Sequence, residues 1–159
     1  MNNNINLSYH RIEKNEIWYA VKHRNNNIRL NSRSGGVFTA VSDYVLEVGG
    51  RIYGCKITDG FLASHSWADT KEERDAFRGS KYIQSDMGNT FRNISEDLKN
   101  GKLVLFSGTP CQVAAIRRYV TIACEDYLEN LILLDIVCHG VPSPKIWQSY
   151  LKWIEEKKR

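Results

Sequence analysis

The 159-residue sequence lacks any long apolar run, which limits the settings in which the protein can work. A helix that crosses a bilayer needs about 20 mostly apolar residues, and no run approaches that length. Residues 1–6 are polar and rich in asparagine, whereas a secretory signal needs a basic stretch followed by an apolar one. We therefore predict a cytoplasmic protein with no membrane insertion.

Closely spaced cysteines are also lacking. The four cysteines are Cys55, Cys111, Cys124 and Cys138. Zinc sites use short cysteine spacings, and disulfide frameworks belong to small secreted chains with little core. Because 42% of the residues are hydrophobic, this chain can bury a core of its own. The thiols are predicted to be reduced, or to be ligands completed by groups outside the chain.

Charge of one sign is not concentrated anywhere. The net charge of +4 comes from 22 basic and 18 acidic residues that are spread along the sequence. A nucleic-acid partner would call for a basic patch, so none is predicted. An anionic small ligand such as a phosphorylated cofactor needs only a few well-placed cations or backbone donors, and the composition allows one.

The first half of the chain predicts two hairpins and short helices. Residues 1–16 show little periodicity and are predicted to be a loose lead-in to a single domain over residues 17–159. Residues 17–23 and 28–30 alternate apolar and polar side chains around an asparagine run, which indicates a β-hairpin. Residues 51–57 and 61–67 predict a second hairpin.

Helical patterns separate and follow these segments. Apolar side chains recur at helical spacing from Val37 to Val48, after a Ser-Gly-Gly turn. Thr70 and Glu73 have the form of a capping box for a short helix that reaches Phe77. A further helix is predicted after Asn89, with an apolar face that ends before Asn100-Gly101.

Two continuous apolar runs dominate the last third of the chain. Residues 103–106 and 131–137 each end in a glycine-containing turn and lead into a helical pattern. Buried parallel strands have this form. We predict an α/β fold, a mostly parallel sheet flanked by helices with added β-hairpins near the N-terminus, and ligand-facing loops at the carboxyl ends of the strands.

The turn after residues 103–106 is a candidate site. Gly108 allows a tight turn, Thr109 can cap the next helix, and Pro110 suits its first position. The backbone donors and partial positive charge of a helix N-terminus stabilise an anion, and they favour the thiolate form of a cysteine placed there. Cys111 is thus a candidate thiolate; the alternative is an ordinary small residue in the first turn.

Cys138 follows the second apolar strand in a similar setting. In an open parallel sheet the two loops should lie close together, and two cysteines there are suited to a soft metal or a cluster. Two thiolates are not a complete ligand set. The neighbouring His139 is a candidate ligand or proton donor, or a residue that stabilises the loop.

Two earlier loops are candidates for binding a cofactor. Ser34, Gly35 and Gly36 precede a helix and could seat a phosphate through backbone donors, or they could simply start the helix. Residues 79–86 combine a lysine, an aromatic ring and small polar side chains, a mixture suited to a flavin ring and its phosphates. The alternative is a solvated loop with residues 82 and 83 turned inward.

Four segments in this order resemble the beta-subunit family of coenzyme F420 hydrogenases and dehydrogenases. They are residues 34–40 (SGGVFTA), 79–85 (GSKYIQS), 106–114 (FSGTPCQVA) and 137–144 (VCHGVPSP). The resemblance spans the N-terminal and central part of the family architecture. It implies an FAD-binding oxidoreductase that passes electrons between iron–sulfur clusters and a small organic acceptor, together with a redox partner protein or subunit.

The resemblance also implies roles for particular residues. The cofactor-binding positions would be Ser34, Gly35, Gly36, Lys81, Tyr82, Gln84, Ser107, Gly108 and Thr109. Cys111 and Cys138 would be a partial set of ligands for a 4Fe-4S cluster, with further ligands supplied from outside this chain. Complete members often begin with a cysteine-rich, ferredoxin-like segment and continue beyond residue 159, so the domain is expected to be truncated relative to them.

Two other functions are compatible with the same residues. One is a degenerate α/β binding or interaction module without redox activity, which the missing cysteine-rich segments favour. The other is thiol chemistry at Cys111 without a bound flavin. Flavin absorbance separates the redox module from both.

Overall fold

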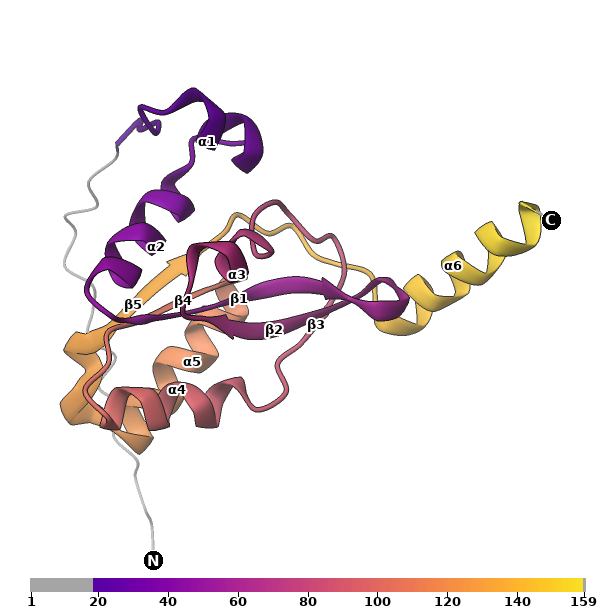
Figure 1. Cartoon of the computed structure of the whole chain (residues 1–159). Helices are drawn as coiled ribbons and strands as arrows, with labels where there is room; N and C mark the ends of the chain where they lie inside the picture. Colours follow the sequence, from indigo (N-terminus) through magenta and orange to yellow (C-terminus); the bar gives the residue numbers. More distant parts are fainter. Residues whose placement is uncertain (1–18, 159) are drawn as a thin grey trace, which may run out of the picture.

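The computed structural model describes residues 19–158, which fold around one five-stranded sheet (Figure 1). The helices are α1 (Asn26–Ser32), α2 (Val37–Glu47), α3 (Lys71–Asp75), α4 (Thr90–Lys99), α5 (Pro110–Ala123) and α6 (Pro144–Lys157). The strands are β1 (Arg51–Thr58), β2 (Leu62–Ala68), β3 (Ser85–Asp86), β4 (Val104–Gly108) and β5 (Leu131–Asp135), and the 3-10 segments are η1 (Asp59–Phe61) and η2 (Glu125–Asn130).

The sheet has the strand order β3-β2-β1-β4-β5 and is mostly parallel. Only β1 and β2 pair antiparallel, as a hairpin, whereas β1 with β4, β4 with β5 and β2 with β3 pair parallel. The predicted α/β fold, its mostly parallel sheet and its second hairpin are therefore confirmed.

Both faces of the sheet are covered. On one face, Tyr53, Phe106 and Val104 pack with the buried residues of α4 and α5, such as Ile94 and Ile116. On the other face, Ile52 and Leu105 pack with residues of α2 and with Phe77, which follows α3. Figure 1 shows α2 on one side of the sheet and α4 and α5 on the other. Successive side chains of β1 and β4 therefore point to opposite faces of the sheet and pack into two separate hydrophobic cores.

The hairpin β1–β2 is longer than the strands beside it. Only Arg51–Tyr53 of β1 pair with β4, so the rest of the hairpin forms an extension that is not paired with β4. This extension contacts the end of β4 through His65, whose ring lies 3.3 Å from the Ser107 carbonyl oxygen. At the tip, the Phe61 carbonyl accepts a hydrogen bond of 2.8 Å from the indole of Trp147 on α6.

The first predicted hairpin is wrong where the structure describes it. Residues 19–25 form no strand, and α1 begins directly after them. The asparagine run does not turn the chain back. Instead the Asn25 side chain accepts from the backbone N–H of Asn27 at 2.8 Å and caps the helix. Residues 1–16, predicted to be a loose lead-in, lie outside the described residues.

The second apolar run forms a shorter strand than predicted. β5 ends at Asp135, and Ile136 and Val137 lie beyond it with 46% and 89% of their surface exposed. β5 is an edge strand with half-buried side chains, because no strand pairs with its outer side in the described sheet. No described helix is both long enough and apolar enough to cross a bilayer.

Candidate functional site

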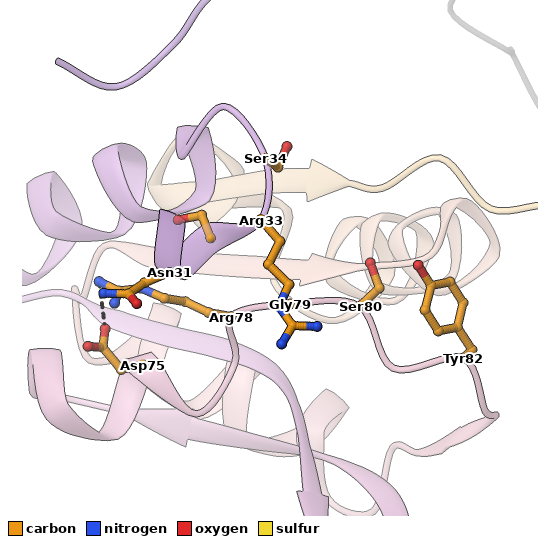
Figure 2. Close-up of a pocket in the computed structure, with 9 residues that line it drawn as sticks. Asn31, Arg33, Ser34, Asp75, Arg78, Gly79, Ser80 and Tyr82 are labelled. Carbon is orange, nitrogen blue, oxygen red and sulfur yellow. Dashed lines mark ion pairs between the residues drawn. The ribbon is translucent and has the colours of Figure 1, made fainter. Parts of the chain in front are cut away.

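A polar cavity of about 500 Å³ lies between the turn that joins α1 to α2 and the loop that follows α3 (Figure 2). It is lined by Asn31, Ser32, Arg33, Ser34, Asp75, Arg78, Gly79, Ser80 and Tyr82. Two of the segments singled out in the sequence, the Ser34 turn and the loop from Gly79, therefore meet at one cavity. Its volume is in the range of small-molecule sites.

Two guanidinium groups give the cavity a positive character. Figure 2 shows the Arg33 side chain extending from the α1–α2 turn toward Gly79, while Arg78 lies across the cavity beside Asp75. Asp75 is shared, because its carboxylate pairs with Arg78 at 2.8 Å and with Arg74 at 2.9 Å. Arg74 also pairs with Asp43 at 2.8 Å and does not line the cavity. The charged side chains of the lining are therefore two guanidinium groups and one carboxylate, and their net positive charge suits an anionic ligand such as a phosphate.

The glycines of the Ser34 turn are first a packing requirement. A Cβ on Gly35 would lie 2.8 Å from the Val21 carbonyl oxygen, and one on Gly36 would lie 2.9 Å from the His23 Cβ. Gly36 also has a φ of 83°, which favours glycine, and it begins α2 without a side-chain cap. Gly36 has no side chain that could accept hydrogen bonds from the first backbone N–H groups of α2. These N–H groups begin at Val37, three residues after Ser34, and are of the kind that can bind an anion.

The other predicted positions in residues 79–86 lie in different settings. Tyr82 is 80% exposed and lines the cavity, so it is not turned inward, whereas the neighbouring Ile83 is buried. Lys81 is half-buried and donates to the carbonyls of Ala76 and Arg78 at 3.1 and 2.9 Å. Burial lowers the pKa of the Lys81 amine, and the nearby Cys55 thiol opposes this shift. The exposed Gln84 contacts only the Ser85 carbonyl, at 3.5 Å.

The turn at the end of β4 begins α5 as the sequence predicts. Thr109 is the N-cap and Pro110 is the first helical residue. The Gln112 carboxamide oxygen accepts from the backbone N–H and the hydroxyl of Thr109, both at 3.0 Å. Cys111 is exposed, with its Sγ 3.2 Å from the Thr109 hydroxyl.

A second polar group connects this turn to β2 and β3. His65 on β2 contacts the Ser107 carbonyl oxygen through Nε2 at 3.3 Å, and Ser85 on β3 through Nδ1 at 3.1 Å. Gln112 donates to the Ser85 hydroxyl at 2.8 Å. Burial lowers the pKa of His65, the hydrogen bond to Ser107 opposes the shift, and the charge of Lys81 adds to it.

The two cysteines at the strand ends follow neighbouring strands. Gly108 of β4 pairs with Asp135 of β5, and the Gly108 carbonyl accepts from Ile136 N at 3.0 Å. The segments that follow β4 and β5 therefore start side by side; Cys111 lies in the first turn of α5, Cys138 lies in the loop after β5, and both thiols are exposed. Within residues 19–158, no three His, Cys, Asp or Glu side chains gather closely enough to hold a metal ion.

The remaining cysteines lie inside the fold. Cys124 is buried at the C-terminal end of α5, where the Ser95 hydroxyl contacts its Sγ at 3.5 Å. Cys55 is half-buried on the hairpin extension, directly across from His65. Burial raises the pKa of the Cys55 thiol, while Lys81 and Ser85 oppose the shift.

Sequence reasoning missed the charged and polar side chains that complete both groups. Arg33 and Arg78 each lie immediately before one of the four family-like segments, and Ser85 and Gln112 lie inside two of those segments. Their position next to or within a motif was the signal that could have marked them as site residues. His65 gave no such signal, because a histidine in an alternating strand has an ordinary pattern. Only the strand order of the sheet brings His65 on β2 close to Ser85 on β3 and to the Ser107 carbonyl on β4.

The open α/β sheet, with polar loops at the carboxyl ends of β4 and β5, defines a class of fold whose ligands bind at that edge. Residues 101–159 match the family model that describes the C-terminal part of the beta subunit in coenzyme F420 hydrogenase/dehydrogenase. The match supports the family resemblance in the last third of the chain. The two earlier motifs, residues 34–40 and 79–85, lie outside the matched residues.

A solved structure shares the fold over most of the chain. It is the F420-reducing [NiFe] hydrogenase complex from Methanosarcina barkeri, derivatised with xenon, and it aligns with a TM-score of 0.66 at 21% identity. The alignment covers 84% of this chain and 49% of that chain, so this chain spans about half the length of that relative. No curated protein matches the chain.

Proposed function

We propose that this chain is an FAD-binding module of an oxidoreductase related to the coenzyme F420 hydrogenase and dehydrogenase beta subunits. The observation that carries the proposal is the cavity at which the Ser34 turn and the Gly79 loop meet between Arg33 and Arg78. The family match over residues 101–159 supports the same assignment from an independent part of the chain.

The cavity fits the anionic part of FAD. Guanidinium groups bind phosphate oxygens through pairs of charge-assisted hydrogen bonds, and Arg33 and Arg78 border the cavity from two different loops. The hydroxyls of Ser34 and Ser80 add neutral donors. In this proposal these four side chains hold the diphosphate, and Gly35 and Gly36 shape the turn that presents Ser34.

The remaining predicted residues would contact the rest of the cofactor. Tyr82 offers an exposed ring on which a flat heterocycle can stack, and Gln84 offers an exposed carboxamide. Lys81 holds a cation beside the cavity loop, where its amine donates to the carbonyls of Ala76 and Arg78. The turn of Ser107, Gly108 and Thr109 would border the cofactor from the sheet edge. FAD, when bound, supplies hydride or single-electron transfer.

The two exposed cysteines would serve an electron path. A 4Fe-4S cluster takes four thiolates, and Cys111 and Cys138 supply two from neighbouring loops. The described residues alone do not make a complete cluster site. The proposal therefore assigns the further ligands to a redox partner protein or subunit, and the final electron transfer to a small organic acceptor.

Visible spectroscopy of the purified protein, handled without oxygen, tests the flavin assignment. We expect added FAD to show perturbed flavin bands and quenched fluorescence on binding, with the affinity falling from FAD to FMN to riboflavin as phosphates are removed. A protein that leaves the FAD spectrum unchanged would refute the redox module and favour the interaction module. Equal binding of riboflavin and FAD would refute the phosphate role of the two arginines.

Reconstitution with iron and sulfide tests the cluster assignment separately. A broad absorbance shoulder that bleaches on reduction, and that is lost in both Cys111→Ser and Cys138→Ser, is expected only when the missing ligands are supplied by a partner. The Cys124→Ser variant is the matched control, because Cys124 is buried away from the two loops.

A further inference from the structure

The hydrogen bonds between β2, β3 and α5 have only one consistent direction. A carbonyl oxygen only accepts, so the Nε2 of His65 must carry the hydrogen that it shares with Ser107. With a neutral ring, Nδ1 is then an acceptor, and the Ser85 hydroxyl donates to it. The Ser85 oxygen in turn accepts from the Gln112 carboxamide nitrogen at 2.8 Å.

The same chain continues into the turn at the end of β4. With its nitrogen directed at Ser85, the Gln112 carboxamide presents its oxygen to the N–H and hydroxyl of Thr109. The single hydroxyl hydrogen of Thr109 is thereby used, so the 3.2 Å contact with Cys111 has the thiol as donor. Each group holds the next in one orientation.

The chain also joins the two parts of the candidate site. Ser85 ends the loop whose earlier residues line the cavity, and Thr109 belongs to the turn at the sheet edge. His65 is fixed by more than hydrogen bonds, because its ring stacks on Phe106 with centroids 5.2 Å apart. Both His65 and Gln112 are 8% exposed, so water does not readily replace a lost partner.

We propose that His65, Ser85 and Gln112 are positioning residues that set the orientation of the Ser107–Gly108–Thr109 turn relative to the cavity loop. That these residues affect FAD binding rests on the proposed function. That they orient the turn rests on the hydrogen-bond chain alone. None of the three residues needs to contact the cofactor. Their loss changes binding through the geometry of groups that do.

Substitutions at Ser85 test the positioning role. In Ser85→Ala we expect about tenfold faster hydrogen exchange at the Thr109 amide and about tenfold weaker FAD binding, because the Gln112 carboxamide loses the partner that orients it. Ser85→Thr keeps the hydroxyl and should restore both values to within about threefold of the wild type. Thr121→Ala removes a hydroxyl that bonds only within α5, to the Arg117 carbonyl, and is the matched control.

A second variant tests the direction of the chain. In Gln112→Glu the carboxylate still accepts from Thr109, but it also accepts from Ser85, which turns the hydroxyl away from His65. Nδ1 then loses its donor, and the pKa of His65 should rise from its lowered wild-type value, with Lys81 and Cys55 as the other titratable groups that face the ring. Nitrogen NMR of the imidazole follows the tautomer and the titration in the protein without FAD.

The outcomes separate the inference from the proposed function. The assigned hydrogen-bond directions are overturned if the neutral His65 ring carries its hydrogen on Nδ1, or if the pKa of His65 in Gln112→Glu equals that in the wild type. If Ser85→Ala leaves both Thr109 exchange and FAD binding unchanged, the positioning role is overturned. If the wild type binds no FAD but Thr109 exchange still quickens in Ser85→Ala, the flavin assignment fails while the positioning of the turn is supported.

Discussion

Replacing Arg33 by glycine should separate the stability of the fold from the binding of its ligand. Arg33 follows α1 with a φ of 52°, in the left-handed region that favours glycine. This conformation costs an ordinary residue about 1 kcal/mol, and glycine removes that cost while losing somewhat more entropy on folding. The net effect of Arg33→Gly on the free energy of unfolding should lie between about 0 and 1 kcal/mol in favour of the variant.

The same substitution should weaken the binding of FAD. A hydrogen bond to a charged group contributes about 1.5 to 3 kcal/mol, so loss of one guanidinium from the cavity should raise the Kd by about 10- to 100-fold. Thermal unfolding would show a Tm unchanged or raised by up to about 4 °C, since about 1 kcal/mol shifts a domain of this size by that much. A flavin titration on the same sample gives the Kd.

The control for this prediction is Arg92→Ala. Arg92 lies on α4 with 77% of its side chain exposed, so the variant loses the same charge away from the cavity. If Arg33→Gly lowers the Tm by several degrees and leaves the Kd unchanged, then Arg33 stabilises the turn and does not bind the ligand. That result would refute the reasoning.

Three further predictions concern the rest of the fold. Asp97→Ala should lower the free energy of unfolding by about 1 to 3 kcal/mol in urea titrations, because the buried Tyr53 hydroxyl loses its 2.6 Å acceptor; a loss below about 1 kcal/mol would contradict this. Gly50→Ala should cost about 2 to 3 kcal/mol, since a Cβ there would lie 2.4 Å from the Leu103 carbonyl oxygen; an unchanged Tm would show that the backbone yields easily. Because burial lowers the pKa of His65, the unfolded chain takes up its proton first as the pH falls below about 6.5, so stability should decrease there and be constant above it. His65→Gln should remove that pH-dependent part, and denaturation at pH 5 to 8 with parallel slopes for both proteins would argue against it.

Local sequence patterns correctly predicted α2, the start of α3 and β4. The helical spacing from Val37 predicted α2, and Thr70 caps α3 through the Glu73 N–H as expected. The apolar run at residues 103–106 became β4, buried on both faces, because a continuous run needs a core on each side. For the two helices the decisive interactions lie within a few residues of one another, whereas the core on each side of β4 is supplied by distant residues.

Where two local interpretations compete, the pattern was not sufficient. The Asn25-Asn26-Asn27 run serves a turn or a helix cap equally well, and the structure has the cap. The apolar run at residues 131–137 predicted a buried strand, but β5 lies at an edge of the described sheet and stops at Asp135. Burial depends on what lies beside a strand, which its own residues do not specify.

The candidate site divides in the same way. The turns at Ser34, Gly79 and Thr109 are encoded locally, because glycine, a capping hydroxyl and proline each constrain the backbone at their own position. Three features depend on how the sheet orders its strands: the meeting of Ser34 with Tyr82 at one cavity, the presence of Arg33 and Arg78 in its lining, and the link from His65 to Gln112. The sequence by itself determined most of the elements and these three turns, since they follow from short-range backbone and side-chain preferences. Tertiary structure alone decided which charges and hydrogen bonds face one another, since these contacts join residues far apart in the chain.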